Sequence, residues 1–399
     1  MVSQVDVTQG KVTVIALDTV GYYHHLFMNG VSVRVLLPIT RDKLRVYLSR
    51  CKDERNDEKN LVRCLARSIA EDYVQNVIKN FDIDVKVKSK SYVYAIRRDS
   101  HAVRIKRIVL TVPNTGSTIV LIPWALRTRD VLYRVHDITG MLTDQARMFY
   151  RRVIEKVKER IGGELTFKRI FEYLTQRSEV PSSRGRSSMV YDVIGDELGI
   201  HSGTMENIVR TILAVDESGM VDVENCNIRI MEPDYREVFA PGHVVVHLVD
   251  ATPIVQRIVV YRVLERIYEF MGPEHLKDKD RIAVILIDEA HLFFPQARSE
   301  DEKSVIEAHL TRLTRLGRGR GIAVVFATHM PSDLNDAVLQ LTNTKIILRS
   351  DEKVLETLGV PSSERRFLTT AATGLAFINS FAYKYPIYVK VRMTAYHVS

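Results

Sequence analysis

Short apolar runs rich in Val and Ile recur along the chain, and polar or acidic residues follow most of them. The runs cover residues 11–17, 117–122, 242–249, 283–287, 322–328 and 345–349. Runs of this length are typical of strands that are buried on both faces of a sheet. Helical segments separate them, so the pattern predicts an α/β fold with a largely parallel sheet and right-handed crossovers.

Helical periodicity is clearest at residues 60–79. Apolar side chains recur there at every fourth position: Leu61, Leu65, Ile69, Tyr73 and Val77. Further helices are predicted at residues 145–160, 166–177, 189–198, 205–214 and 255–271, with Gly and Pro between several of them. Ser299 and Glu302 offer a capping box for a helix after the 283–287 strand.

This order of elements predicts three parts of the chain. Residues 1–140 form the first part of the core, with a helix and hairpin region inserted at about residues 29–112. Residues 141–236 form an inserted helical subdomain, and residues 237–399 form the second part of the core.

Alternating stretches at residues 85–88, 92–96 and 103–112 predict an antiparallel hairpin set. Basic residues are dense in this region, and four of them are candidates for nucleic-acid contact: Lys86, Lys88, Arg97 and Arg98. A Ser-rich loop supplies two more candidates, Arg184 and Arg186. A solvated strand face or an ordinary connector explains the same charges, so both interpretations stay open.

Two adjacent carboxylates, Asp288 and Glu289, follow the apolar run at residues 283–287. The carboxyl ends of strands are where open α/β sheets bind ligands. Nucleotide hydrolysis needs an acid that holds magnesium through its water shell and a second group that polarises the attacking water, and these residues suit the two roles. Thr328 and His329 follow the next strand and are candidate sensors of the γ-phosphate. The alternative is a pair of strand ends capped by polar residues.

Composition narrows the class of protein. The 399 residues carry a formal net charge of +8, which favours an anionic partner such as nucleic acid. Cys51, Cys64 and Cys226 show no close pairing that would suggest zinc ligands or a disulfide framework. No apolar run approaches the roughly 18 residues needed to span a bilayer. We therefore expect a soluble, cytoplasmic protein without a membrane partner.

The chain resembles the HerA/FtsK family of P-loop ATPases, in particular the archaeal HerA-type DNA translocases and helicases. The stretches that carry the resemblance are VILIDEAHLFF at residues 284–294, RLTRLGRGRGIAVVFATHMPSDL at residues 312–334 and NTKIILR at residues 343–349. The closing segment GLAFINSFAYKYPIYVKVR at residues 374–392 is also similar. DTVGYYHHL at residues 18–26 looks like a degenerate form of the DxHGEY-type turn of the family.

The resemblance implies a RecA-like fold and a role for each matching residue. Asp288 matches the magnesium-binding acid of the Walker B motif, Glu289 the catalytic glutamate, and Asp18 a nucleotide-binding position. The family pattern ATQRPSDL is ATHMPSDL here, so His329 replaces the usual sensor glutamine beside Thr328. Two arginines that follow resemble those that act as a finger or an internal contact in such motors, Arg315 and Arg318.

The same resemblance implies ATP and Mg²⁺ as cofactors and a homo-hexameric ring around duplex DNA. It also implies a partner nuclease of the NurA kind and a role in DNA end processing and repair.

One departure from the family pattern is large. The sequence contains no GxxxxGK[ST] phosphate-binding loop, and the β-barrel that usually precedes it in HerA is missing as well. A start at an internal methionine of a longer protein is the explanation we favour, because Asp288 and Glu289 are intact. The alternative is a divergent paralogue or adaptor that binds DNA or a partner without turning over ATP.

Overall fold

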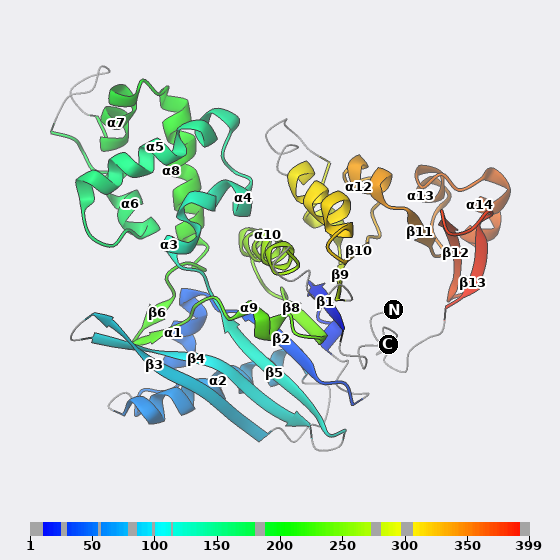
Figure 1. Cartoon of the computed structure of the whole chain (residues 1–399), viewed down its shortest axis with the longest axis horizontal. Coiled ribbons are helices and arrows are strands. Elements are labelled where there is room, and N and C mark those ends of the chain that lie inside the picture. The colour runs from blue at the N-terminus through cyan, green and yellow to red at the C-terminus, as the bar shows by residue number, and fades with distance from the viewer. Residues whose placement is uncertain are drawn as a thin grey trace.

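A mixed sheet forms the centre of the molecule in the order β10-β9-β1-β8-β2-β5-β4-β7-β6, with β3 paired to β4 (Figure 1). The computed structural model describes residues 11–24, 30–54, 57–78, 86–97, 100–112, 115–179, 188–272, 281–296 and 306–391. The strands of this sheet are β1 (Val12–Asp18), β2 (Val33–Pro38), β3 (Lys86–Arg97), β4 (Ser100–Val112), β5 (Ser117–Trp124), β6 (Glu224–Asn225), β7 (Ile228–Arg229), β8 (Gly242–His247), β9 (Ile282–Ile287) and β10 (Ile322–Phe326). Neighbours from β10 to β5 run parallel, so the predicted α/β fold with a largely parallel sheet is confirmed.

Helices cover both faces of the parallel strands. In chain order, the helices of the described residues include α1 (Arg41–Ser49), α2 (Glu58–Val77), α3 (Thr128–Val131), α4 (Val135–Thr139), α5 (Asp144–Ile161), α6 (Phe167–Leu174), α7 (Val190–Leu198), α8 (Ser202–Glu217), α9 (Tyr235–Val238), α10 (Pro253–Phe270), α12 (Asp336–Leu341), α13 (Glu352–Thr357) and α14 (Ser362–Thr369). Short 3-10 turns lie at Leu132–Arg134 and Ala290–Leu292, and a π-helical turn lies at Thr311–Leu316.

The central strands are mostly apolar because each of their faces packs against a separate core. In β2, Val35 belongs to the cluster under α1 and α2, whereas Leu36 belongs to the cluster under α10. Residues 13–18 of β1 are buried without exception. Continuous runs are expected of parallel strands covered on both sides, and this explains why the sequence showed no alternation there.

Helices α5 to α8 pack on one another beside the sheet (Figure 1). Thr143 and Thr166 cap α5 and α6, and their hydroxyls accept hydrogen bonds from the N–H groups of Ala146 and Arg169 at 3.2 Å. The helices expected at residues 145–160, 166–177, 189–198 and 205–214 are confirmed with shifted ends. The three-part division at residues 140 and 236 stays a prediction.

Two strand predictions need correction. Strand β2 lies between β8 and β5 in the parallel core, although residues 29–112 were expected to be an insertion outside it. The run at residues 345–349 was expected to be a core strand, but β11 (Thr344–Ile347) forms a separate antiparallel sheet with β12 (Leu375–Ser380) and β13 (Ile387–Lys390). The capping box at Ser299 and Glu302 lies outside the described residues.

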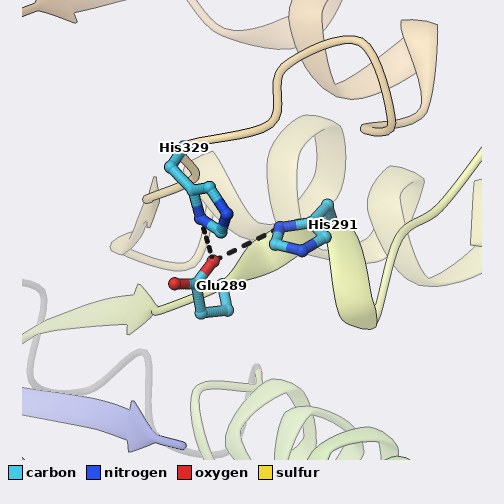
Figure 2. A group of neighbouring side chains, drawn as sticks. All are labelled: Glu289, His291 and His329. Carbon is cyan, nitrogen blue, oxygen red and sulfur yellow. Dashed lines mark hydrogen bonds and ion pairs between the residues drawn. The ribbon is translucent and has the colours of Figure 1, made fainter. Parts of the chain in front are cut away.

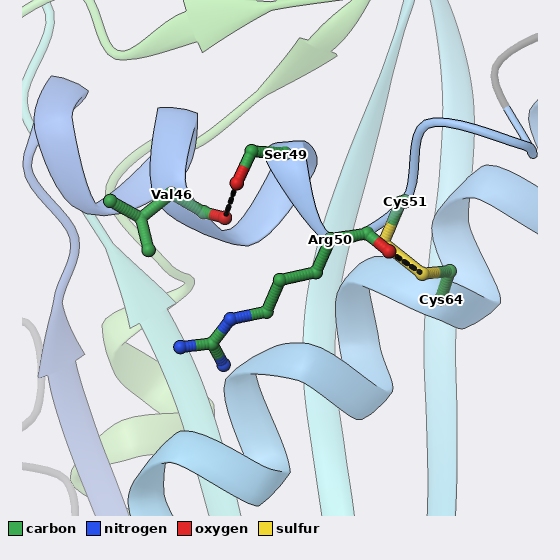
Figure 3. Close-up of a disulfide and its surroundings, with 5 residues drawn as sticks. All are labelled: Val46, Ser49, Arg50, Cys51 and Cys64. Carbon is green, nitrogen blue, oxygen red and sulfur yellow. Dashed lines mark hydrogen bonds between the residues drawn. A yellow bond between two sulfur atoms is a disulfide. The ribbon is translucent and has the colours of Figure 1, made fainter.

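The cysteine prediction is also wrong. Cys51 and Cys64 form a disulfide that joins the chain after α1 to α2, with a separation of 5.8 Å between their Cα atoms (Figure 3). Sequence spacing did not reveal the pair, because the two cysteines are 13 positions apart, with Cys51 just after α1 and Cys64 within α2. Cys226 is exposed and free.

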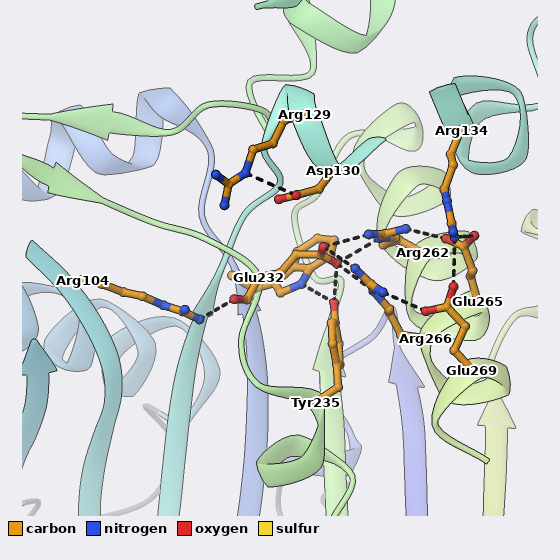
Figure 4. Close-up of polar contacts among 11 residues, drawn as sticks. Arg104, Arg129, Asp130, Arg134, Glu232, Tyr235, Arg262, Glu265, Arg266 and Glu269 are labelled. Atoms are coloured by element: carbon orange, nitrogen blue, oxygen red, sulfur yellow. Dashed lines mark hydrogen bonds and ion pairs between the residues drawn. The ribbon is translucent and has the colours of Figure 1, made fainter. Parts of the chain in front are cut away.

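A buried ion network ties the segment after β7 to α10 (Figure 4). Arg262 donates to both oxygens of Glu232, from Nε at 2.9 Å and from Nη2 at 2.8 Å, and Arg266 Nη2 adds a bond of 2.9 Å. Arg262 is 1% exposed and Glu232 10%, so these charges lie inside the protein. The Tyr235 hydroxyl donates to Glu232 at 2.8 Å and accepts a bond from the Trp124 indole at 2.8 Å.

In the part of the chain that the structure describes, no helix combines the length and apolar character that crossing a bilayer requires.

Candidate functional site

The site begins where β9 ends. Asp288 and Glu289 follow the last strand residue, and Glu289 adopts the left-handed conformation with φ of 48° and ψ of 49°. Its N–H donates to Asp288 Oδ1 at 3.1 Å. A side chain with a Cβ pays roughly 1–2 kcal/mol for this conformation, which turns the chain sharply into the Ala290–Leu292 helix. The two carboxylates therefore stand at the carboxyl end of the sheet, as the sequence predicted.

Strand β10 brings a second set of polar residues to the same edge. The N–H of Ala327 donates to the Ile287 carbonyl at 2.9 Å, and the N–H of Ala290 donates to the Ala327 carbonyl at 2.9 Å. These bonds continue the β9–β10 pairing past the strand ends. Thr328 and His329 are held beside Glu289 as a result.

Glu289, His291 and His329 form a compact cluster (Figure 2). Glu289 Oε2 lies 2.9 Å from His329 Nδ1 and 3.4 Å from His291 Nδ1. His291 Nδ1 is also 3.1 Å from the Thr328 hydroxyl, and the two imidazole rings meet edge to face at 5.2 Å. Glu289 and His291 are half-buried, whereas His329 is exposed. The structure thus brings together three residues that the sequence predicted, Glu289, Thr328 and His329. It adds His291, which the sequence analysis did not identify.

Asp288 lies in an environment that disfavours its charge. Burial raises the pKa of its carboxyl group, and the charges of Glu289 and Asp18 add to the rise, although the N–H of Glu289 opposes it. A bound cation would relieve this repulsion, so Asp288 fits the predicted role of a magnesium ligand.

Asp18 ends β1 and is enclosed by the turn that follows it. Its side chain is 0% exposed, and its oxygens accept bonds from the N–H groups of Val20 at 3.2 Å, Gly21 at 2.7 Å and Tyr23 at 2.9 Å. Burial raises the pKa of this carboxyl group, and the backbone bonds oppose the rise. Asp18 thus holds the turn after β1, and its role in nucleotide binding stays a prediction.

A buried histidine pair extends from Asp18 into the core. His24 Nε2 lies 3.5 Å from Asp18 Oδ2 and 3.2 Å from His247 Nδ1, and His24 Nδ1 lies 2.8 Å from the Tyr73 hydroxyl. Burial lowers the pKa of His247 to about 3, with the charges of His24 and Lys43 adding to the effect. His247 is therefore neutral at physiological pH. Sequence reasoning missed this chain because its members come from β8, α2 and the turn after β1.

The two candidate arginines lie at and after the π-helical turn. Arg315 and Arg318 are both exposed, and no hydrogen bond or ion pair joins either of their side chains to another described residue. Arg320, in contrast, donates to the Tyr268 carbonyl at 2.8 Å and stacks 3.8 Å above the ring of Tyr268. Arg315 and Arg318 are thus available to a second subunit or a ligand, and Arg320 is not.

The proposed nucleic-acid residues are only partly described. Lys88 is exposed on β3, Lys86 and Arg97 belong to β3 without described side chains, and Arg98, Arg184 and Arg186 lie outside the described residues. On the neighbouring β4, Arg104 donates to the Glu232 carbonyl and Lys106 pairs with Glu237. Some of the basic side chains of this sheet therefore form contacts within the protein that stabilise its fold.

A largely parallel α/β sheet, with paired carboxylates at one strand end and polar sensors at the next, is the arrangement of the P-loop ATPase class. Residues 190–348 match the family model described as helicase HerA-like C-terminal. The segment of this chain that holds β8, β9 and β10 is therefore similar to the C-terminal part of HerA-like helicases.

Curated relatives support this assignment over shorter stretches. The DNA double-strand break repair helicase HerA of Pyrococcus furiosus is 36% identical over 66 residues, which are 16% of this chain and 11% of that protein. The probable DNA double-strand break repair helicase HerA of Methanocaldococcus jannaschii is 28% identical over 123 residues, which are 29% of this chain and 24% of that protein. The chain thus covers less than a quarter of the length of either relative.

Solved structures show weaker likeness. VirB4 of Thermoanaerobacter pseudethanolicus is 11% identical with a TM-score of 0.42, over 96% of this chain and 90% of that one. The plasmid coupling protein TrwB is 11% identical with a TM-score of 0.43, over 68% of this chain and 72% of that one.

Proposed function

We propose that this chain carries the hydrolytic centre of an ATP-driven motor that moves along duplex DNA. The observation that carries the proposal is the contact of 2.9 Å between Glu289 and His329, made across the adjacent ends of β9 and β10. This contact supports the proposal, because hydrolysis of a γ-phosphate uses a carboxylate together with a polar group from the neighbouring strand. The names of the HerA relatives, which are DNA double-strand break repair helicases, support DNA as the track.

In the proposed reaction, Glu289 accepts a hydrogen bond from the attacking water and orients it toward the γ-phosphate. His291 and His329 hold the carboxylate from two sides, and Thr328 fixes the ring of His291. Asp288 is the residue placed to hold Mg²⁺ through water, and the ion, when bound, supplies charge to stabilise the phosphate oxygens. Because the site is half-buried, these contacts are stronger than they would be in open water.

We further propose that the motor is a homo-hexamer and that Arg315 or Arg318 reaches the nucleotide site of the next subunit. Their exposure supports this role, since a finger residue must be available to another chain. DNA end processing together with a NurA-like nuclease is the activity we propose for the assembly.

The test is ATP turnover with and without duplex DNA. For a complete protein, with a phosphate-binding loop, we expect turnover that duplex DNA stimulates. Glu289→Gln should abolish it and leave binding of a fluorescent ATP analogue intact, because the amide cannot polarise water. Glu307→Gln, which removes the same charge from an exposed helical position, is the matched control and should behave as wild type. Undiminished turnover in Glu289→Gln would remove this residue from catalysis.

A second candidate is an adaptor that binds DNA or a partner without turnover. The sequence favours it in one respect, because it holds no GxxxxGK[ST] to surround the β- and γ-phosphates with backbone amides and a lysine. Binding of duplex DNA without ATP turnover in any condition would support this candidate. Turnover that DNA leaves unchanged would instead indicate a nucleotide-dependent regulator.

A further inference from the structure

We propose that Glu289, His291 and His329 form a binding site for a divalent transition-metal ion of the Zn²⁺ type. The site is separate in chemistry from the magnesium position at Asp288. It goes beyond the proposed function, and only its effect on turnover, described below, rests on that function.

The geometry of the three side chains supports this assignment. Their donor atoms all lie within 4.8 Å of one another, and two separations are 2.9 and 3.4 Å. Two ligands about 2.1 Å from a tetrahedral ion stand about 3.4 Å apart, so the distances from Glu289 to the two histidines are already within about half an ångström of what the ion requires. The nitrogen of each histidine that faces the carboxylate is Nδ1 in both cases, which leaves Nε2 on the outer side of each ring.

The donor set selects the kind of ion. Imidazole nitrogens suit Zn²⁺, Co²⁺, Ni²⁺ and related ions, whereas Mg²⁺ prefers an all-oxygen shell. Two histidines and one carboxylate leave at least one coordination position for water, as in open zinc sites. His329 is 67% exposed, so an ion can enter from solution without a rearrangement of the core.

The backbone holds two of the three ligands close together. His291 lies on the Ala290–Leu292 turn, directly after Glu289 and Ala290. Glu289 is fixed by its left-handed backbone and by the β9–β10 bonds on both sides of it. When the ion binds Nδ1 of His291, it replaces the contact of 3.1 Å between this nitrogen and the Thr328 hydroxyl.

Occupation of this site has a consequence for the proposed motor. The ion takes a lone pair of Glu289, the same carboxylate that is proposed to orient the attacking water. Zn²⁺ should therefore inhibit turnover, and removal of the ion by a chelator should restore it.

The experiment titrates the full chain with Zn²⁺ by calorimetry and with Co²⁺ by visible absorption. Both are done in a Cys226→Ser background without thiol reductants, so that no free thiol competes. We expect one ion per chain, a Co²⁺ spectrum typical of four or five ligands, and no displacement by excess Mg²⁺. His329→Gln and His291→Gln should each weaken binding at least about tenfold, since even the loss of a residue that only orients a metal ligand has such an effect.

The matched control is His101→Gln. His101 also pairs with a carboxylate, that of Glu58, but it lacks a third ligand and is 50% exposed. It should leave binding unchanged. Equal binding by wild type and His329→Gln would overturn the proposal, as would equal losses in His329→Gln and His101→Gln. Because the readouts require no ATP, a chain that binds Zn²⁺ but never turns over ATP contradicts the motor and leaves the metal site standing.

Discussion

Glu232 keeps its charge inside the protein because two arginines surround it. Burial alone would raise the pKa of its carboxyl group, but the hydrogen bonds and charges of Arg262 and Arg266 outweigh burial and lower this pKa to about 2. The folded pKa therefore lies below the ordinary value of 4.5. Stability from this group is present above about pH 4.5 and is lost as the pH falls toward 2.

Glu232→Gln should lower the free energy of unfolding by about 3 kcal/mol at neutral pH, because it removes the carboxylate that Arg262 and Arg266 share and leaves the buried Arg262 with Glu265 as its ionic partner. It should also flatten the loss of stability between about pH 4.5 and pH 2. Urea unfolding of both proteins across this range measures the two effects. Glu206→Gln, which breaks only an exposed pair with Arg210, is the control. An equally steep acid loss in Glu232→Gln would assign that loss to other carboxylates.

At the residue scale, the sequence predicted those site residues that directly follow a strand. Asp288, Glu289, Thr328 and His329 each follow an apolar run, so their meeting at one sheet edge was predictable. The contacts of Asp18 and His24 could not be predicted from the sequence. They depend on a turn that folds N–H groups back onto a carboxylate and on His247, a residue 223 positions away from His24.

At the element scale, the disulfide between the end of α1 and α2 has a measurable effect. The bond closes a loop with a sequence separation of 13 residues. Such a cross-link restricts the unfolded chain and contributes about 3 kcal/mol in the chain-entropy model. Reduction, or the variant Cys64→Ser, should lower the free energy of unfolding by about this amount. Cys226→Ser removes an exposed free thiol and should change nothing; an unchanged unfolding midpoint after reduction would contradict a stabilising role.

Two strands show why element predictions failed in places. Strand β2 carries Arg34, a charge that interrupts its apolar run, but its guanidinium donates to the carbonyls of Glu237 and Pro241, each at 3.1 Å. The segment that accepts these hydrogen bonds lies 203 to 207 residues further along the chain, so nothing in the sequence near Arg34 indicates the pairing. In β11 only Ile347 is buried, so this strand suits the outer face of a small sheet better than a core covered on both sides.

At the scale of the whole molecule, β1 lies between two strands that come much later in the chain. It pairs with β8 and β9, which begin at Gly242 and Ile282. The helices were predictable because they depend on contacts between residues that are close in the sequence. The order of the strands was not predictable, because parallel strands are joined by long connections whose sequence does not specify which strands pair.

The position of β1 also has a consequence for how the protein is made. At 5–20 residues per second, a ribosome needs roughly 10–50 s after finishing β1 before it reaches the end of β8. During that time a strand whose residues 13–18 are all buried in the folded protein has neither of its neighbours, and such long-range pairing is slow to form even afterwards. Nascent chains arrested at about residue 240 should be cleaved by protease near β1, whereas chains arrested well beyond residue 330 should be protected there. Early protection would mean that β1 finds a temporary partner; without one, the nascent chain depends on chaperones until its central strand is paired.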